Sequence, residues 1–151
     1  RLHMGNFGYF ADLRQDAADL RFFADEDATP LAHYVERFDP VNRIAMIWVK
    51  LPRAAPGQVQ QLHMYYGNPD APSAENAAGV FDRNTVLALD FSGVDGLRDR
   101  TAYGLQPIRA DVLPESAGLI ADGIRFAANQ RIELPQTQVL AYAPEQGRTV
   151  S

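Results

Sequence analysis

The sequence predicts an all-β protein built as an antiparallel β-sandwich or jelly roll. Short segments rich in β-branched, aromatic and aliphatic residues recur at regular spacing, and turn residues separate them. Helical periodicity is almost absent from the chain. With 151 residues and 46% hydrophobic content, the chain is long enough to bury one real core.

The N-terminal part of the chain predicts three short strands joined by turns. They are Arg1–Met4, Leu20–Ala24 and Leu31–Phe38. In the second of these we expect Leu20 and Phe22 to point inward, because side chains alternate along a strand. Phe7, Tyr9 and Phe10 are expected to seat in the core as a lid.

Residues 43–71 predict a central hairpin, entered through an Asp-Pro-Val-Asn turn at residues 39–42. In the first strand, Ile44–Leu51, both alternating sets are apolar, which predicts that both faces are covered. Pro and Gly residues in the connection end that strand. In the second strand, Val59–Tyr66, one face is core and the other is exposed or binds a ligand. The core set is Leu62, Met64 and Tyr66, and the outer set is Gln61, His63 and Tyr65.

The turn-rich stretch after Tyr66 marks a candidate boundary between two modules, residues 1–78 and 79–151. A short surface helix is expected at 74–78, ended by Gly79. Trp48 is expected in the core or in an interdomain contact, where replacement by Ala would cost roughly 3–5 kcal/mol.

Beyond the boundary, residues 85–91 predict a strand, and residues 124–126 and 131–134 predict a hairpin around Ala128–Gln130. Too few strands remain to close a second sandwich. We therefore expect residues 79–151 to be truncated or to complete the first module.

Composition excludes several classes of function. The net charge is −5 and the pI is near 5.1, and Lys and Arg are scattered, so no footprint for nucleic acid or anionic lipid is present. The chain has no Cys, which excludes disulfides, thiolate metal sites and Cys nucleophiles. No window approaches the ~20 apolar residues of a membrane-spanning helix. Both ends lie in strand-like runs, so we expect a fragment of a longer protein.

Four segments together resemble a bacterial and archaeal family known as DUF2341, a domain of unknown function. They are Asp19–Phe22, Tyr34–Glu36, Ile47–Pro52 and Met64–Pro69. Members of that family sit in secreted or surface proteins and in envelope proteins tied to proton channels of the MotA/TolQ/ExbB type. The resemblance therefore implies a periplasmic or extracellular location in the cell envelope. It implies no catalytic or binding residue, because none is established for the family.

In that family the domain is often followed by a concanavalin A or laminin-G-like sandwich. Four segments of the second module look like the start of such a sandwich. They are Leu87–Phe91, Asp99–Gly104, Gly123–Phe126 and Ile132–Pro135.

Two acidic groups offer oxygen ligands that suit Ca²⁺. They are Asp25, Glu26 and Asp27 in one turn and Asp90, Asp95 and Asp99 in a later loop. A solvated turn explains the first group equally well, and the second lacks a diagnostic spacing, so metal binding stays open. His3, His33 and His63 fall on separate predicted strands, with no pair spaced to share a metal ion.

No catalytic pattern is present in the sequence. A G-x-S-x-G nucleophile motif is absent, as is a run of alternating carboxylates such as E-x-D-x-x-E, which concanavalin-like glycosidases use. We therefore predict a non-enzymatic chain with no cofactor.

A binding face is the remaining candidate site. Three pairs of outward positions are expected to share the outer side of one sheet: Arg21 and Phe23, Tyr34 and Glu36, and His63 and Tyr65. Aromatic rings flanked by hydrogen-bonding groups suit sugar binding, so Phe23, Tyr34, Glu36, His63 and Tyr65 are the predicted ligand-binding residues. Packing of the same aromatic residues against a neighbouring module is the alternative.

The favoured hypothesis is a non-catalytic cell-envelope module for recognition or adhesion, with a glycan as ligand. One alternative is a structural or protein-interaction module attached to a MotA/TolQ/ExbB-type transport assembly. A second alternative is a fragment of a glycosidase, which would need a carboxylate pair ~5–9 Å apart.

Overall fold

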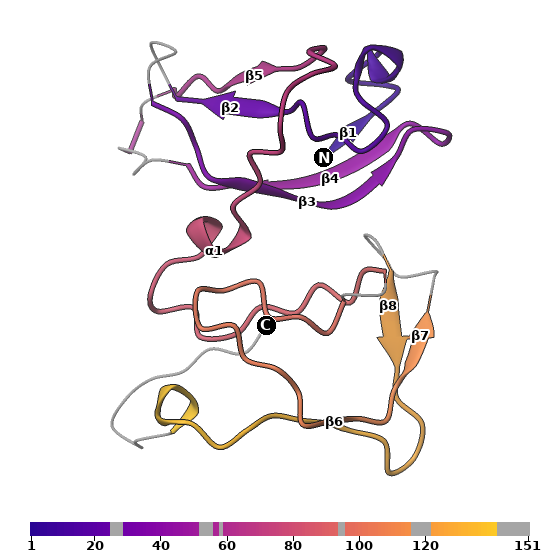
Figure 1. Cartoon of the computed structure of the whole chain (residues 1–151), viewed down its shortest axis with the longest axis vertical. Helices are drawn as coiled ribbons and strands as arrows, with labels where there is room; N and C mark the ends of the chain where they lie inside the picture. The colour runs from indigo at the N-terminus through magenta and orange to yellow at the C-terminus, as the bar shows by residue number, and fades with distance from the viewer. Residues whose placement is uncertain (25–28, 52–55, 58, 94–95, 116–121, 142–151) are drawn as a thin grey trace.

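The computed structural model describes residues 1–24, 29–51, 56–57, 59–93, 96–115 and 122–141. All the described strands pair in antiparallel ladders (Figure 1). They are β1 (Leu2–His3), β2 (Arg21–Phe23), β3 (His33–Asp39), β4 (Ile44–Val49), β5 (His63–Tyr65), β6 (Arg109–Ala110), β7 (Leu113–Glu115), β8 (Gly123–Arg125) and β9 (Ile132–Glu133). The all-β prediction is confirmed, whereas a sandwich or jelly-roll topology is not established.

Helical structure in the described residues is short. The α-helix α1 spans Ala77–Val80, and single 3₁₀ turns occur at Phe10–Asp12 and Gln138–Leu140. The predicted surface helix at residues 74–78 is shifted along the chain: it begins after Asn76, whose side chain accepts a hydrogen bond from the Gly79 N–H. Gly79, which was expected to end the helix, lies within it. No helix in the part of the chain described here is both long and apolar enough to cross a membrane.

The largest sheet has the strand order β1-β4-β3, with β4 in the centre. The connection from β3 to β4 is a tight turn closed by Asp39. Its carboxylate accepts hydrogen bonds from the Asn42 backbone N–H at 2.9 Å and from the Asn42 side-chain amide at 2.8 Å. Asp and Asn favour such turns because their short side chains bond the nearby backbone. The turn predicted at residues 39–42 is confirmed.

The predicted central hairpin is wrong. Strand β4 pairs with β3 and β1, whereas β5 pairs with β2 in a separate two-stranded sheet. Strand β4 ends at Val49, and the Pro and Gly residues that follow in the sequence do not decide which strand pairs with it. Met64 of β5 is partly buried and packs against the core from the β2–β5 sheet.

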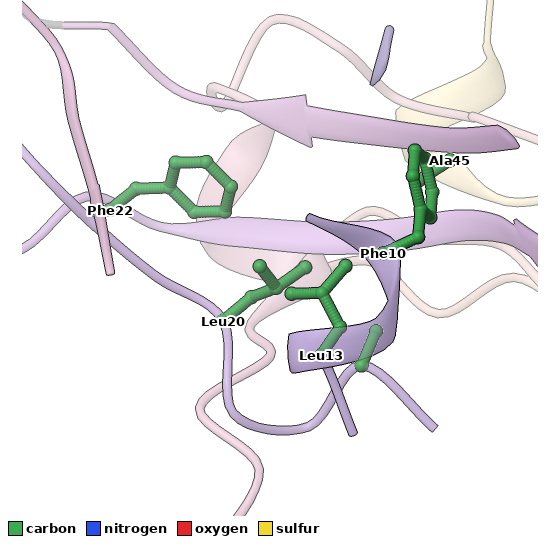
Figure 2. Close-up of a cluster of buried hydrophobic side chains, with 6 residues drawn as sticks. Phe10, Leu13, Leu20, Phe22 and Ala45 are labelled. Carbon is green, nitrogen blue, oxygen red and sulfur yellow. The ribbon is translucent and has the colours of Figure 1, made fainter. Parts of the chain in front are cut away.

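The core of the N-terminal half receives side chains from both sheets and from the 3₁₀ turn (Figure 2). Its buried members are Phe10, Leu13, Ala17, Leu20, Phe22 and Ala45. The predicted inward positions Leu20 and Phe22 are confirmed. The predicted aromatic lid is confirmed for Phe10 and partly for Phe7. Tyr9 is exposed, although its ring lies beside those of Phe7 and Tyr66.

The second half contains two short ladders, β6 with β9 and β7 with β8. The predicted hairpin around Ala128–Gln130 is wrong in its pairing. A turn does occur there, with a hydrogen bond from the Gln130 N–H to the Ala127 carbonyl at 3.1 Å, but β8 pairs backward to β7 and β9 to β6.

The strand predicted at residues 85–91 is absent from the ladders of the described chain. That segment is held instead by single hydrogen bonds from the following loop, including one from the Arg100 N–H to the Ala88 carbonyl at 2.9 Å. The segment has strand propensity, but no strand among the described residues lies beside it to complete a ladder.

Candidate functional site

The β2–β5 sheet has an outer aromatic face, which we define by Arg21, Phe23, His63 and Tyr65. These four residues alternate with Phe22 and Met64, which pack against the core, so they lie on the opposite side of the strand pair. Register places Arg21 opposite Tyr65 and Phe23 opposite His63. Six positions were expected to share one side of a sheet, and these four of them do.

Two rings dominate the outer aromatic face. Phe23 and Tyr65 lie diagonally across the strand pair, with ring centroids 5.6 Å apart and ring planes at 89°. This edge-to-face arrangement is attractive and fixes both rings. Tyr65 remains 46% exposed, so its ring is accessible from solvent.

Arg21 stabilises the fold through hydrogen bonds to the backbone. Its guanidinium donates to the Ala18 carbonyl at 2.9 Å, to the Leu20 carbonyl at 2.7 Å and to the Pro72 carbonyl. Three carbonyl acceptors hold the side chain along the protein surface. The other polar groups of the outer aromatic face are the imidazole of His63 and the hydroxyl of Tyr65.

A clasp lies beside the outer aromatic face and consists of Arg14, Asp19, Arg21 and Gly67. The buried Asp19 carboxylate accepts one hydrogen bond from the Arg14 N–H at 3.1 Å and another from the Gly67 N–H at 2.6 Å. Gly67 has φ of +93°, a conformation that favours glycine. The clasp ties the chain after β5 to the segment before β2.

The clasp gives a structural role to three residues of the segments that resemble DUF2341. Asp19 and Arg21 belong to the segment Asp19–Phe22, and Gly67 belongs to the segment Met64–Pro69. Arg14 completes it by donating to the Ala71 carbonyl at 2.7 Å. Sequence reasoning missed this role, because the partners are about fifty residues apart. The pairing of an Asp with a distant turn Gly became visible only in the fold.

Tyr34 and Glu36 lie elsewhere, and their predicted place on the same sheet as Phe23 and Tyr65 is wrong. They belong to β3, which is in the three-stranded sheet. Tyr34 is only 4% exposed, so its ring is not available to a ligand. Alternation of side chains along a strand predicts which residues share a face of that strand, but it does not predict which of two sheets the strand joins.

Trp48 lies opposite Tyr34 and is half exposed, so its predicted place in the core is wrong. The two rings are stacked with planes 8° apart and centroids 6.4 Å apart. Phe81, from beyond the predicted boundary at residue 78, lies 6.5 Å from the Trp48 ring. Trp48 thus contacts a residue beyond the predicted boundary, while the interdomain nature of that contact stays a prediction. Together with Tyr34 and Arg100 these rings form what we call the junction cluster.

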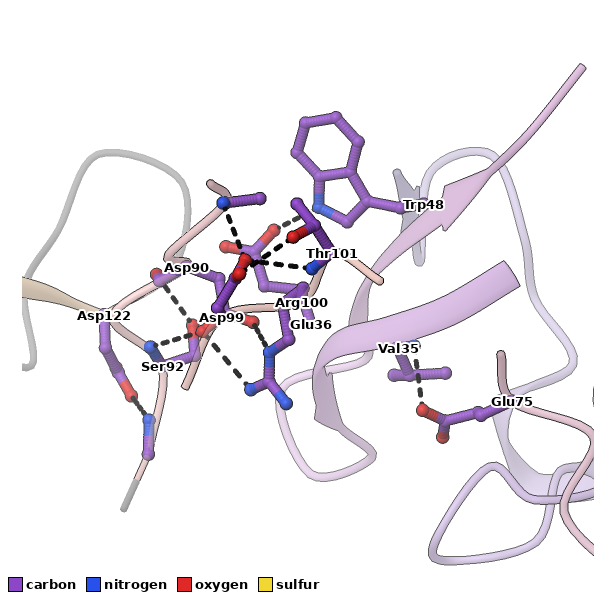
Figure 3. A network of polar contacts seen from close by, with 12 residues as sticks. Val35, Glu36, Trp48, Glu75, Asp90, Ser92, Asp99, Arg100, Thr101 and Asp122 are labelled. Carbon is purple, nitrogen blue, oxygen red and sulfur yellow. Dashed lines mark hydrogen bonds and ion pairs between the residues drawn. The ribbon is translucent and has the colours of Figure 1, made fainter. Parts of the chain in front are cut away.

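Arg100 completes the junction cluster. Its guanidinium carbon lies 5.9 Å from the centre of the Tyr34 ring, and its Nε donates to the Asp90 carboxylate at 2.7 Å (Figure 3). Burial raises the pKa of the Tyr34 hydroxyl, and the nearby Asp90 and Glu36 carboxylates raise it further, against the opposing effect of Arg100. Tyr34 therefore stays neutral and acts as a packing group.

Asp99 organises the loop after residue 96. Its buried carboxylate accepts hydrogen bonds from the Ala88 N–H at 3.1 Å, from the Leu105 N–H at 2.9 Å, and from both the backbone N–H and the hydroxyl of Thr101 (Figure 3). Protein donors thus occupy the oxygens that were candidate calcium ligands. The Asp90 carboxylate likewise forms an ion pair with Arg100. Groups of the protein therefore pair with both of these candidate calcium ligands.

Comparison with known families decides where the chain belongs. The family model described as Domain of unknown function (DUF2341) matches residues 16–93, just over half of the chain. The chain belongs to this family. No curated protein and no solved structure matches it.

The DUF2341 match includes the outer aromatic face, three residues of the clasp (Asp19, Arg21 and Gly67) and the three rings of the junction cluster, whereas Arg14 lies before its start. It runs past residue 78, while Arg100 and Asp99 lie beyond its end. The division of the chain at residues 78 and 79 stays a prediction, as does a concanavalin A or laminin-G-like second module.

Metal binding finds no support in the part of the DUF2341 chain that the structure describes. No group of three or more His, Asp or Glu side chains there is arranged to hold an ion. The three histidines lie on β1, β3 and β5, as expected. The acidic turn at Asp25–Asp27 and the loop residue Asp95 lie outside the described residues.

His33 is the buried histidine of the DUF2341 domain. Its ring packs edge-on against Phe22 with centroids 5.0 Å apart, and its Nδ1 lies 3.5 Å from the Leu31 carbonyl. Burial lowers the pKa of His33; the Leu31 carbonyl and Glu75 oppose this effect, and Arg21 adds to it. His33 is therefore neutral in the folded domain at neutral pH.

We expect the free energy of unfolding to fall as the pH drops below the ordinary His value of 6.5. The unfolded chain takes up a proton there, whereas buried His33 resists protonation, so acid favours the unfolded state. The loss ends once the pH has fallen through the lower pKa of the folded state. Urea denaturation on both sides of pH 6.5 measures it.

His33→Gln should flatten this part of the pH dependence, and the same substitution at His63 is the matched control. An unchanged slope in His33→Gln would contradict the assignment to His33.

Proposed function

We propose that this DUF2341 chain is a non-catalytic recognition module that binds a glycan on its outer aromatic face. The observation that carries the proposal is the fixed edge-to-face pair of Phe23 and Tyr65 with an accessible Tyr65 ring. Sugars present apolar C–H faces that stack on such rings, while their hydroxyls need polar partners. His63, opposite Phe23, supplies a polar group at the edge of the rings.

The chemistry of the outer aromatic face favours binding over hydrolysis. Its four residues include no Asp or Glu, whereas glycoside hydrolysis needs two carboxylates that flank the scissile bond. A sugar on this face would be held without a general acid or a nucleophile. The face therefore supports recognition as its role.

A cell-envelope location fits this proposal, because polysaccharides and glycoproteins are abundant there. The location rests on the resemblance to DUF2341 members and is tested by fractionating cells that make the parent protein. Recovery with the cytoplasmic fraction would count against an adhesion role.

The test is a glycan and polysaccharide binding panel, run with and without Ca²⁺. We expect saturable binding to the wild-type chain and its loss in the double variant Phe23→Ala/Tyr65→Ala. The matched control is Phe126→Ala, which removes an exposed aromatic side chain next to β8, far from this face in the sequence. Circular dichroism confirms that each variant is folded.

Two results would overturn the proposal. One is a folded wild-type chain that binds no member of the panel in either condition. The other is binding that survives in the double variant. The first result would favour the alternative of a structural or protein-interaction module attached to a transport assembly.

A further inference from the structure

A β-bulge in the β3–β4 ladder sets the position of Glu36. Val35 pairs with Ile47 and Arg37 pairs with Met46, so Glu36 is the extra residue on β3. A bulge bends the strand and re-aims the side chain at that point, and bulges are enriched next to functional sites. Here the bulge directs the carboxylate toward the opposite strand.

The Glu36 carboxylate fixes the indole of Trp48. Its Oε2 accepts a hydrogen bond from the indole Nε1–H at 2.5 Å (Figure 3). A hydrogen bond to a charged acceptor is stronger than a neutral one, so the ring is held in one orientation. Stacking on Tyr34 supports the ring from β3, and 48% of Trp48 remains exposed. The result is a rigid aromatic surface with a carboxylate at its edge.

Glu36 makes no ion pair with any of the described residues. The nearby Arg100 is neutralised by Asp90 at 2.7 Å, and Arg37 pairs with Asp39 at 3.5 Å and Asp122 at 3.9 Å. A negative charge therefore remains beside the exposed indole.

We propose that Trp48 and Glu36 bind an alkylammonium group. The face of an indole attracts a cation more strongly than any other aromatic side chain, and the carboxylate adds direct charge attraction. A neutral sugar would leave the charge of Glu36 uncompensated. A hard metal ion would need six to eight oxygen ligands, whereas one carboxylate is present beside the ring. The site is separate from the outer aromatic face and does not depend on glycan binding.

The same chemistry has two sources, a small quaternary ammonium compound or the Lys side chain of a partner protein. Trp48 is the single Trp of the chain, so its intrinsic fluorescence reports ligands at this site. We would titrate the chain with choline, with a short Lys-containing peptide and with glucose, at constant ionic strength. Response to choline or to the peptide identifies the source.

We expect a saturable change in fluorescence with at least one ammonium ligand and none with glucose. Glu36→Gln should weaken binding at least tenfold, because the amide keeps the acceptor for the indole N–H but loses the charge. The matched control is Glu133→Gln on β9, which changes the net charge equally and should bind as the wild type does. Thermal melting confirms that both variants are folded.

The proposal is overturned if no ammonium ligand changes the fluorescence, if Glu36→Gln binds as well as the wild type, or if glucose produces the same response. Binding at the outer aromatic face is measured on the Phe23→Ala/Tyr65→Ala variant, which retains Trp48. Failure of glycan binding and failure of ammonium binding are therefore separate results.

Discussion

Replacing Leu20 by Ala is expected to lower the free energy of unfolding by about 2–5 kcal/mol. Leu20 is fully buried and sits among Phe10, Leu13 and Phe22 in the core (Figure 2). Its removal loses hydrophobic burial and leaves a cavity that the two sheets cannot close without moving. Chemical denaturation followed by circular dichroism measures the loss.

The matched control for Leu20 is Leu62→Ala, the same change at a side chain that is 44% exposed. We expect a clearly smaller loss there, because less apolar surface is buried. Equal losses in the two variants would contradict the core as described. Trp48→Ala should also cost less than the 3–5 kcal/mol expected of a core Trp, since Trp48 is half exposed.

Replacing Asp99 by Ala is expected to destabilise the loop that follows it by about 3 kcal/mol or more, since each buried donor left without an acceptor costs about 1–3 kcal/mol. The backbone N–H groups of Ala88, Thr101 and Leu105 would all lose the same acceptor. Amide hydrogen exchange at these three residues measures the effect where it occurs.

The matched control for Asp99 is Asp82→Ala. Asp82 accepts hydrogen bonds from the Asn84 and Thr85 N–H groups in a similar way, but it is exposed, so water can replace its oxygens. We expect a smaller change in exchange near Asp82. Comparable protection in Asp99→Ala and in the wild type would contradict the role assigned to Asp99.

The pH dependence gives a second measure of Asp99. Burial alone would raise the pKa of its carboxyl, but the combined hydrogen bonds from Thr101, Ala88 and Leu105 outweigh burial and lower it below the ordinary 3.8. The stabilisation is therefore complete above pH 3.8 and is lost as the pH falls through the pKa of the folded state. Asp99→Asn should remove this acid dependence.

Much of the outer aromatic face could be predicted from the sequence. The alternation of Leu20 and Phe22 with Arg21 and Phe23 gave the correct sides of β2. The alternation around Met64 did the same within β5, but Leu62, which was predicted in the core set, lies before β5 and is 44% exposed. Such patterns are readable because neighbouring side chains of a strand point to opposite faces. The Asp-Pro-Val-Asn turn was readable for a similar reason, since its hydrogen bonds are local.

The junction cluster could not be predicted. Both faces of β4 are apolar, so nothing in the pattern says that Trp48 is half exposed or that Phe81 and Arg100 come to lie beside Tyr34. The clasp could not be predicted either, because Asp19 and Gly67 are far apart in the chain. The bulge at Glu36, which aims its carboxylate at Trp48, depends on the partner strand and has no signature in β3 alone.

Local patterns in the sequence were enough to predict the all-β class, the inward and outward sides of β2 and β5 and the turn between β3 and β4. The pairing of β5 with β2, and of β4 with β1 and β3, emerged only in the folded chain, and it sets which aromatic side chains share a surface. The physical reason is that side-chain alternation and turn formation are local, whereas strand pairing is chosen by the burial of all apolar faces in one core.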